Sequence, residues 1–328
     1  MSNPILSLAS DARAEFEAQG FLQKPLGEFD FPKTQLWTSA AGPVLYSVYG
    51  DKSAENLVFA SMPYGNDLDS PNMQLRLQAQ AIALPEGSCV IGVQEVSPSK
   101  LPLDKNQYKE LKSGSMLPFG QRLLGLIEGL RPSHDQRVSL YGFSMGADIT
   151  AEAADYALFD ENGSNVQIDN IGIFEPARVE KRSRGKVLGA FSNSGPDLYE
   201  NVVTSNSQAL NEHYGIDPNA DQETEKKAFD KRIAAKVIKA SIGHPVKNLV
   251  LLKAFTNDET SKKLHRITAK IHPTIMGVTV GRAKDSTITS NLIFSFGLAA
   301  EAYVIPGTHA IADDLAVSAA MLAKTVGL

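Results

Sequence analysis

The stretch RVSLYGFSMGADIT, residues 137 to 150, decides the fold that the sequence predicts. β-forming residues occupy Val138–Tyr141, and the pattern Gly-x-Ser-x-Gly follows them at once, with Ser144 at its centre. A small-residue, alanine-rich segment then runs over Met145–Leu158, as is typical of a helix. The pattern therefore predicts a strand, a very tight turn at the serine, and a helix that lies close to its strand because the flanking glycines leave room.

The rest of the chain alternates strand-like and helix-like segments, which favours a mostly parallel sheet flanked by helices. Several predicted strands are continuous Val/Ile/Leu runs, as expected where both faces of a sheet are covered. The predicted strands are Gln35–Thr38, Val44–Tyr49, Leu57–Ser61, Cys89–Val93, Val138–Tyr141, Ile168–Phe174, Asn248–Leu252, Ile275–Val280 and Ala302–Ile305. The predicted helices of the core are Met73–Ile82, Pro118–Leu130, Met145–Leu158 and a closing helix, Ala310–Val326.

One long segment, residues 178–243, interrupts this alternation. It contains a polar part, Asn193–Asn219, and then a charged helix over Glu223–Ala240. We expect a mainly helical cap or lid inserted into a core domain made of residues 1–177 and 244–328, because loops at the carboxyl ends of parallel strands line the ligand crevice of such folds. The alternative is a surface elaboration with no role in binding.

The composition narrows the class of protein. The 328 residues are 43% hydrophobic and 21% charged, with a net charge of −5, so no strong attraction to nucleic acid or membrane is predicted. No apolar run approaches the roughly 18 residues of a membrane span, and the start of the chain lacks the pattern of a signal peptide. The single cysteine, Cys89, excludes an internal disulfide. We therefore expect a cytoplasmic location.

The Gly-x-Ser-x-Gly pattern between a strand and a helix, together with the order of the predicted elements, resembles the α/β-hydrolase superfamily. The resemblance extends over most of the chain, from about residue 35. The resemblance implies an α/β-hydrolase fold with Ser144 as nucleophile, followed in chain order by an acid and a histidine. It also implies hydrolysis of an ester, thioester or amide through an acyl-enzyme, with a small-molecule acyl substrate. The sequence holds no Walker loop, GxGxxG, HExxH or CxxC pattern, so we expect no cofactor and no metal.

A serine nucleophile needs a base, and His309 is the predicted one. The string AYVIPGTHAIADDL gives a short strand, a Pro-Gly turn, the histidine and a terminal helix, which resembles the last strand and histidine loop of the superfamily. The other histidines precede the serine, stand at the start of strands, or lie in the insertion or in a basic helix-like stretch, namely His134, His213, His244, His265 and His272.

The acid that orients the histidine is predicted to be Asp285. The superfamily places this residue after the strand before the last, and Asp285 follows the predicted strand Ile275–Val280. A helix N-cap is the alternative role for this aspartate. Glu175, at the end of the strand after the nucleophile helix, is the alternative acid, and Asp258 is a weaker third candidate.

The oxyanion of the tetrahedral intermediate needs two donors. One is predicted to be the backbone N–H of Met145. The other should lie after strand Leu57–Ser61, where Tyr64 offers a backbone N–H and a hydroxyl. The string Pro63-Tyr64-Gly65 resembles the loop of cocaine-esterase-type and X-prolyl-peptidase-type hydrolases, in which a tyrosine hydroxyl serves, but it departs from the more frequent His-Gly. A plain turn is the alternative.

Two other functions remain open at this point. The same fold and residues fit a non-catalytic ligand-binding or scaffold protein if the triad is misaligned, and an acyltransferase if an alcohol or amine reaches the acyl-enzyme before water. The acyl group of the substrate and the oligomeric state do not follow from the sequence.

Overall fold

The structure is a computed structural model of the chain. It describes residues 3–63, 67–96, 101, 104–131, 135–160, 164–179, 181, 183, 195–243, 253–278, 301–305 and 309–328, and the account below concerns these residues.

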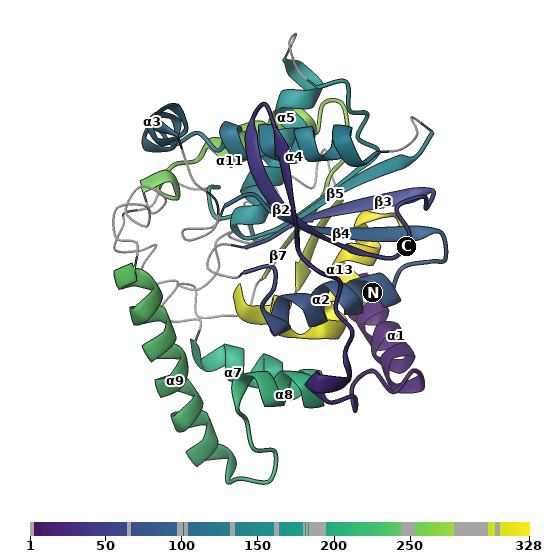
Figure 1. Cartoon of the computed structure of the whole chain (residues 1–328), viewed down its shortest axis with the longest axis vertical. Coiled ribbons are helices and arrows are strands. Elements are labelled where there is room, and N and C mark those ends of the chain that lie inside the picture. Colours follow the sequence, from purple (N-terminus) through teal and green to yellow (C-terminus); the bar gives the residue numbers. More distant parts are fainter. Residues whose placement is uncertain are drawn as a thin grey trace.

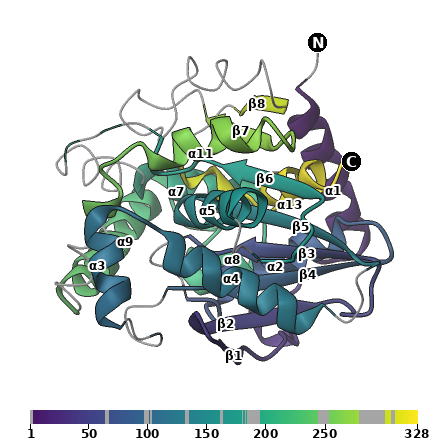
Figure 2. The same cartoon turned by 90° about the horizontal axis from the view of Figure 1, so that it is seen from above.

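An eight-stranded sheet forms the centre of the molecule, in the order β1-β2-β4-β3-β5-β6-β7-β8. Figure 2 shows the strands in this order, from β1 at the bottom of the view to β8 at the top. β1 and β2 pair antiparallel, as do β2 and β4, and every other pair is parallel. The strands are β1 Gln35–Ser39, β2 Gly42–Tyr49, β3 Asn56–Ser61, β4 Ser88–Gln94, β5 Arg137–Phe143, β6 Asn170–Phe174, β7 Thr274–Val278 and β8 Glu301–Ile305.

The predicted mostly parallel sheet is confirmed, and eight of the nine predicted strands correspond to these elements. The ninth, Asn248–Leu252, lies outside the described residues. β6 begins two residues later than predicted, at Asn170, since the preceding Asp169 uses its carboxylate to accept the backbone N–H of Val138 at 2.8 Å.

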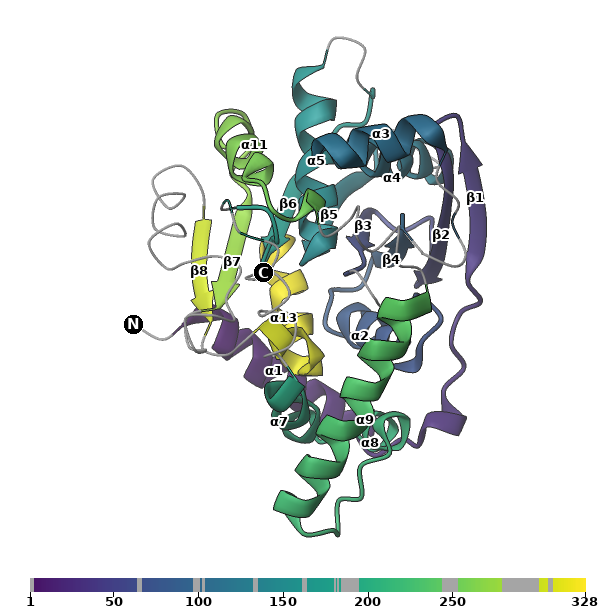
Figure 3. The ribbon, with the colours of Figure 1, turned by 90° about the vertical axis from the view of Figure 1, so that its left-hand side faces the viewer.

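Helices cover both faces of the sheet, and Figure 3 shows the two layers above and below the strands. One layer holds α3, α4, α5 and α11, and the other holds α1, α2 and α13. The bounds are α1 Pro4–Ala18, α2 Pro71–Ile82, α3 Lys105–Ser113, α4 Leu117–Leu130, α5 Met145–Phe159, α11 Glu259–Ile267 and α13 Leu315–Thr325.

Each face of the sheet packs into its own hydrophobic core. Successive residues of β3 show this alternation: Leu57 and Phe59 belong to the core under α4 and α5, whereas Val58 and Ala60 belong to the core under α2 and α13. All four side chains are fully buried. The central strands are therefore apolar on both faces, which explains why they read as continuous Val/Ile/Leu runs in the sequence.

The inserted segment is helical where the structure describes it. It contains α7 Gly195–Ser205, α8 Gln208–Tyr214 and α9 Gln222–Gly243; in Figure 1, α7 and α8 lie below α2 and α13, and α9 runs along the left side. α8 packs on α2 and on the 3₁₀ helix η1, Leu26–Glu28, while α7 packs on the 3₁₀ helix η2, His309–Asp313. The predicted helical character of this segment is thus present; we call α7, α8 and α9 the cap, and that they cover the site as a lid stays a prediction.

Two features of the chain ends differ from the sequence prediction. Helix α1, which we did not predict, packs against α13, with Asn3 capping its start by accepting the N–H of Ile5. The predicted single helix Ala310–Val326 is two elements, because Asp314 ends η2 and caps α13 by accepting the N–H groups of Ala316 and Val317. None of the described helices combines the length and apolar character that a membrane crossing requires.

Candidate active site

Ser144 lies at the sharp turn between β5 and α5, in a conformation that non-glycine residues rarely adopt. Its φ is 57° and its ψ is −123°, and the residue is 4% exposed. Left-handed backbone of this kind costs about 1–3 kcal/mol and persists only where the surroundings enforce it. The predicted strand, tight turn and helix around this serine are therefore present, with the strain located at the serine itself.

The two glycines of the motif allow the helix to approach the sheet. A Cβ atom on Gly142 would overlap the backbone of Gly146 and lie 2.6 Å from the nitrogen of Ala147. A Cβ atom on Gly146 would overlap the carbonyl oxygen of Ser61 and lie 2.6 Å from its carbonyl carbon. Neither glycine has a positive φ, so both are required for clearance rather than for backbone freedom.

The end of β6 lies directly beside Ser144. The serine donates its backbone N–H to the carbonyl oxygen of Phe174 at 3.0 Å, continuing the register that pairs Phe143 with Phe174. The next residue, Glu175, also has a positive φ, 45°, and is fully buried. Because adjacent strands are about 4.8 Å apart, the backbone of this glutamate is a near neighbour of Ser144.

Met145 begins α5, so its N–H belongs to the first turn, whose N–H groups have no acceptor within the helix. The positive end of the helix dipole is also at this turn. The carbonyl oxygen of Ser144 accepts the N–H groups of Ala147 and Asp148 at 3.0 and 3.3 Å. The backbone at the start of α5 can therefore stabilise negative charge that develops beside the serine.

A second buried carboxyl lies just beyond β4. Ser61 donates its hydroxyl to Oε1 of Glu95 at 2.6 Å, and Arg122 donates from Nη1 to the carbonyl oxygen of Glu95 at 3.0 Å. Burial raises the pKa of Glu95 from its ordinary 4.5 to about 8, against the opposing effect of the Ser61 hydrogen bond. The carbonyl group of Ser61 also packs against Gly146, so the hydrogen bond between Ser61 and Glu95 lies directly beside the turn at Ser144.

Arg76 of α2 connects the turn to the segment that begins with His309. Its guanidinium carbon lies 5.7 Å from the centre of the Phe143 ring, and its Nη2 lies 2.7 Å from Oδ1 of Asp313, the last residue of η2. Ser205, at the end of α7, donates its hydroxyl to the carbonyl oxygen of Asp313 at 3.1 Å. The core and the cap thus both hold η2 in place.

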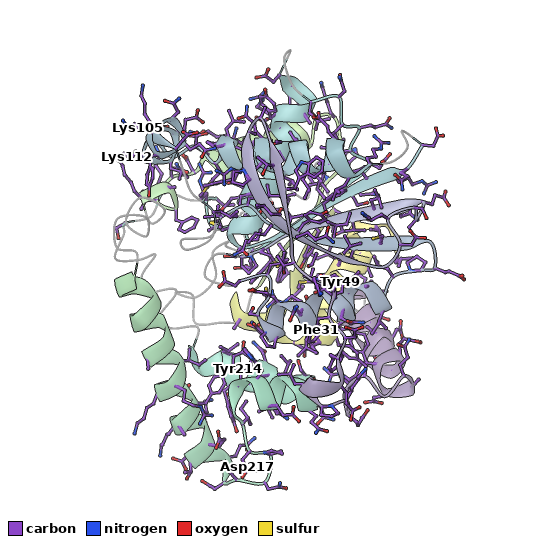
Figure 4. The ribbon with its side chains drawn as sticks, in the orientation of Figure 1. Phe31, Tyr49, Lys105, Lys112, Tyr214 and Asp217 are labelled. Carbon is purple, nitrogen blue, oxygen red and sulfur yellow. The ribbon has the colours of Figure 1, made fainter. Side chains whose placement is uncertain are left out.

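The cap also contacts α2 beside this ion pair. The amide of Asn72 donates to the hydroxyl oxygen of Tyr214 at 3.2 Å, and burial, followed by the charge of Asp313, raises the pKa of that hydroxyl. Figure 4 shows Tyr214 between the helices α7 and α8 and the core, whereas Asp217 lies at the lower tip of the cap. The cap is therefore anchored to the elements around the site by polar contacts as well as by packing.

Comparison with known proteins identifies the fold. No protein-family model matches the chain, and no curated protein matches its sequence. Among solved structures, a bromoperoxidase from Bacillus anthracis is similar with a TM-score of 0.50 and 15% identity, over 90% of this chain and 98% of that one. A haloalkane dehalogenase from Agrobacterium tumefaciens is similar with a TM-score of 0.50 and 11% identity, over 89% and 94% of the two chains.

The chain has the α/β-hydrolase fold. This confirms the predicted fold class, including parallel strands that place the turn at Ser144 on the carboxyl edge of the sheet. At identities this low the comparison concerns the fold, and the roles of individual residues stay predictions.

Within this fold, the structure describes some of the predicted site residues and not others. Ser144, Met145 and Glu175 come together at the carboxyl ends of β5 and β6. His309 is the first residue of η2, shortly after β8, and its side chain lies outside the described part of the structure. Tyr64 and Asp285 also lie outside the described residues.

The third candidate acid has a structural partner. Asp258 directly precedes α11, and Nζ of Lys262 in that helix lies 3.3 Å from its carboxylate, which is partly buried. Within the described residues, no group of histidine, cysteine, aspartate and glutamate side chains is arranged to hold a metal ion.

Sequence reasoning missed Arg76 and Glu95. Neither belongs to a motif, and each acquires its role from a partner far away in the chain. The one available signal for Glu95 is its position two residues after the predicted buried strand Cys89–Val93, where a carboxyl is unexpected unless it faces a site.

Proposed function

We propose that this α/β-hydrolase is a serine hydrolase that cleaves an ester, thioester or amide through an acyl-enzyme on Ser144. The observation that carries the proposal is the conformation of Ser144, whose φ of 57° between β5 and α5 holds its side chain at the carboxyl edge of the sheet. Backbone strain of this kind concentrates at functional sites. The fold of the two similar structures supports a hydrolase in the broad sense.

In the proposed mechanism, His309 removes the proton from the Ser144 hydroxyl as the oxygen attacks the acyl carbon. The N–H of Met145 and a donor from Tyr64 stabilise the oxyanion of the tetrahedral intermediate. His309 then returns the proton to the leaving group, whose bond to the acyl carbon breaks. Water, activated by the same histidine, releases the acid and restores the serine.

Asp285 is the proposed acid partner of His309, because it follows β7 as the chain order of the superfamily requires. Glu175 is the alternative, supported by its complete burial and its position next to Ser144. Substitutions Asp285→Asn and Glu175→Gln separate them. If Glu175→Gln abolishes turnover and Asp285→Asn does not, the assignment of Asp285 is wrong.

The direct test is labelling with a fluorophosphonate probe, followed by mass spectrometry of the peptide that contains residue 144. We expect one covalent adduct on Ser144 and none in Ser144→Ala. A wild-type protein that does not react, although it is folded, would favour the non-catalytic binding protein on the same fold.

A series of p-nitrophenyl esters of increasing acyl length then defines the substrate class. Ser144→Ala is the control at every chain length. Adding primary alcohols to the same assay distinguishes the acyltransferase alternative, since an acyltransferase would form the alkyl ester in preference to the free acid.

A further inference from the structure

A polar pocket of about 210 Å³ lies on the α5 side of the sheet, outside the residues proposed for catalysis. The turn between α3 and α4 forms one wall, and the side chains of Glu152, Arg178, Glu259 and Lys263 form the others. Figure 4 places α3, marked by Lys105 and Lys112, at the same upper side of the molecule. Glu152 lies two turns along α5 from Ser144, about 12 Å along the helix axis.

Arg178 is a fully buried cation in the wall of this pocket. Its guanidinium donates from Nε to the amide oxygen of Asn257 at 3.0 Å and from Nη2 to the carbonyl oxygen of Gly114. Both acceptors are neutral, and Nη1 has no hydrogen-bond partner among the residues that the structure describes. The charges of Asp148 and Glu152 act on this guanidinium, but neither carboxylate is a hydrogen-bond partner of Nη1, and an unmade hydrogen bond on a buried cation is costly.

Asp148 makes no hydrogen bond to the guanidinium of Arg178 among the described contacts. Asp148 accepts the backbone N–H groups of Ala177 and Arg178 and the hydroxyl of Thr260, at 3.3, 3.1 and 2.8 Å respectively. Burial raises the pKa of Asp148 to about 6, although the charge of Arg178 opposes this rise. Asp148 therefore fixes the backbone of residue 178, and Nη1 of the Arg178 guanidinium keeps an unused donor in the wall of the pocket.

Glu152 contributes a hydrogen-bond acceptor to the wall of the same pocket, whereas Arg178 contributes a donor. Its Oε1 lies 3.3 Å from Nζ of Lys263 and accepts the hydroxyl of Ser115 at 3.4 Å, whereas Oε2 is buried with no partner in the described residues. Burial raises the pKa of this carboxyl. Lys263 is shared with Asp155, at 3.2 Å. Glu152 thus retains an acceptor that needs a donor.

The pocket therefore combines an unused donor on a cation with an unused acceptor on a carboxyl. A metal ion would be repelled by Arg178, and a simple anion would leave Oε2 of Glu152 unsatisfied. A volume of about 210 Å³ corresponds to roughly seven water molecules at ~30 Å³ each. This volume suits a compact organic acid better than a substrate with a long chain.

We propose that this pocket binds a small hydroxycarboxylate, with the carboxylate on Nη1 of Arg178 and the hydroxyl donating to Oε2 of Glu152. The planar fork of an arginine matches a carboxylate, and a single negative charge is repelled less by Glu152 than a phosphate dianion would be. The accessible lining of the pocket lies at Ser113, which is exposed, and at Glu259, whose side chain is 42% exposed, compared with 3% for the Glu152 side chain.

The test uses glycolate and acetate as probes, with the full chain carrying Ser144→Ala so that turnover does not interfere. Isothermal calorimetry measures both affinities at the same pH and salt concentration. Because a hydrogen bond to a charged group contributes about 1.5–3 kcal/mol, we expect glycolate to bind roughly tenfold or more tightly than acetate.

The variant Glu152→Gln, added to the same background, should reduce this ratio to about twofold or less, since the amide can no longer serve as the charged acceptor of the hydroxyl. Acetate should bind at least as well as before, because a negative charge has been removed from the pocket. Glu223→Gln is the matched control, as Glu223 is an exposed glutamate of α9 that also pairs with a lysine. It should leave both affinities unchanged.

Arg178→Met should abolish the binding of both probes. If this variant does not fold, the ratio in Glu152→Gln decides the matter alone. The proposal is overturned if neither probe binds saturably, if phosphate binds more tightly than glycolate, or if Glu152→Gln leaves the preference for glycolate intact. None of these outcomes depends on Ser144 being a nucleophile.

Discussion

The first turn of α5 and the middle of the same helix differ in what lies against them. At Gly146 the backbone of β3 touches the helix so tightly that a single methyl group does not fit. At Glu152 the backbone is also closely packed, against Gly120 of α4, but the side chain lines a pocket whose walls carry unpartnered polar atoms. Backbone contacts therefore define the turn at Ser144, whereas side chains from distant segments define the pocket.

The largest effect should come from filling the tight contact. Gly146→Ala forces its Cβ into the carbonyl of Ser61, and we expect a loss of about 3 kcal/mol of unfolding free energy. The fluorophosphonate adduct should be lost with it. Urea unfolding measures the stability.

Gly27→Ala is the control for this substitution, since an added Cβ there meets nothing within 4 Å. Equal stability of the two variants would show that the contact between β3 and α5 is looser than described.

The next largest effect should be on the pH dependence of stability, through the buried carboxyl of Glu95. Glu95 has a hydrogen-bond partner and a pKa raised by burial to about 8, so the folded state holds its proton more tightly than the unfolded state, whose pKa is near 4.5. The stability from this group is full below pH 4.5 and is lost as the pH rises to 8. Glu95→Gln should flatten the fall of unfolding free energy over this range.

The difference between wild type and Glu95→Gln isolates this group, because Asp148 and Glu152 titrate in the same direction in both proteins. Unfolding midpoints in urea at the two ends of the range are sufficient. An unchanged slope in the variant would mean that the carboxyl of Glu95 is hydrated in the folded protein.

A smaller effect should follow from releasing the backbone strain at Ser144. Ser144→Gly should stabilise the fold by about 1–2 kcal/mol, because glycine adopts a φ of 57° without penalty. Ser144→Ala keeps the strain and should change the stability little, while both variants lose activity. Calorimetric melting of the pair gives the comparison. Identical melting temperatures would indicate that the turn is not strained.

The smallest effect on stability is expected at Glu152, in the pocket. Glu152→Gln should change the unfolding free energy by less than about 1 kcal/mol, because Oε2 has no partner to lose and Lys263 keeps Asp155. Urea unfolding without added ligand tests this. A loss comparable to that of Gly146→Ala would show that the pocket is part of the packed core.

The same contrast explains which features could be predicted from the sequence. The strands around Ser144 are apolar on both faces, and the glycines beside the serine are the residues that a close helix requires, so local patterns were sufficient. The strands pair into the mostly parallel sheet that was predicted. Each buried strand is recognisable from its own hydrophobic run, without knowledge of the strands beside it.

Other features depend on contacts that no local pattern encodes. The pocket joins Glu152, Arg178, Lys263 and the turn between α3 and α4, which are separated in the chain. The ion pair between Arg76 and Asp313 likewise links residues 237 positions apart.

Helix α1 has the local sequence pattern of a helix. Asn3 and Pro4 are a capping residue and a first-turn residue, and Ile5, Ala9, Ala12 and Phe16 form its buried face. These signals all lie within residues 3–16, so local sequence patterns are sufficient to predict this helix.

The pairing of α1 with α13 has a consequence for the order in which the molecule can be completed. The side chain of Asn3 donates to the carbonyl oxygen of Val304 at 2.7 Å, across 301 positions of the chain, and Arg13 pairs with Asp314 at 3.2 Å. During synthesis on a ribosome, the apolar face of α1 must wait until nearly all of this sequence has been translated. Contacts of such separation slow folding and leave apolar surface exposed in the meantime. His309 lies between these two contacts, so the segment that carries the proposed base is among the last to be set in place.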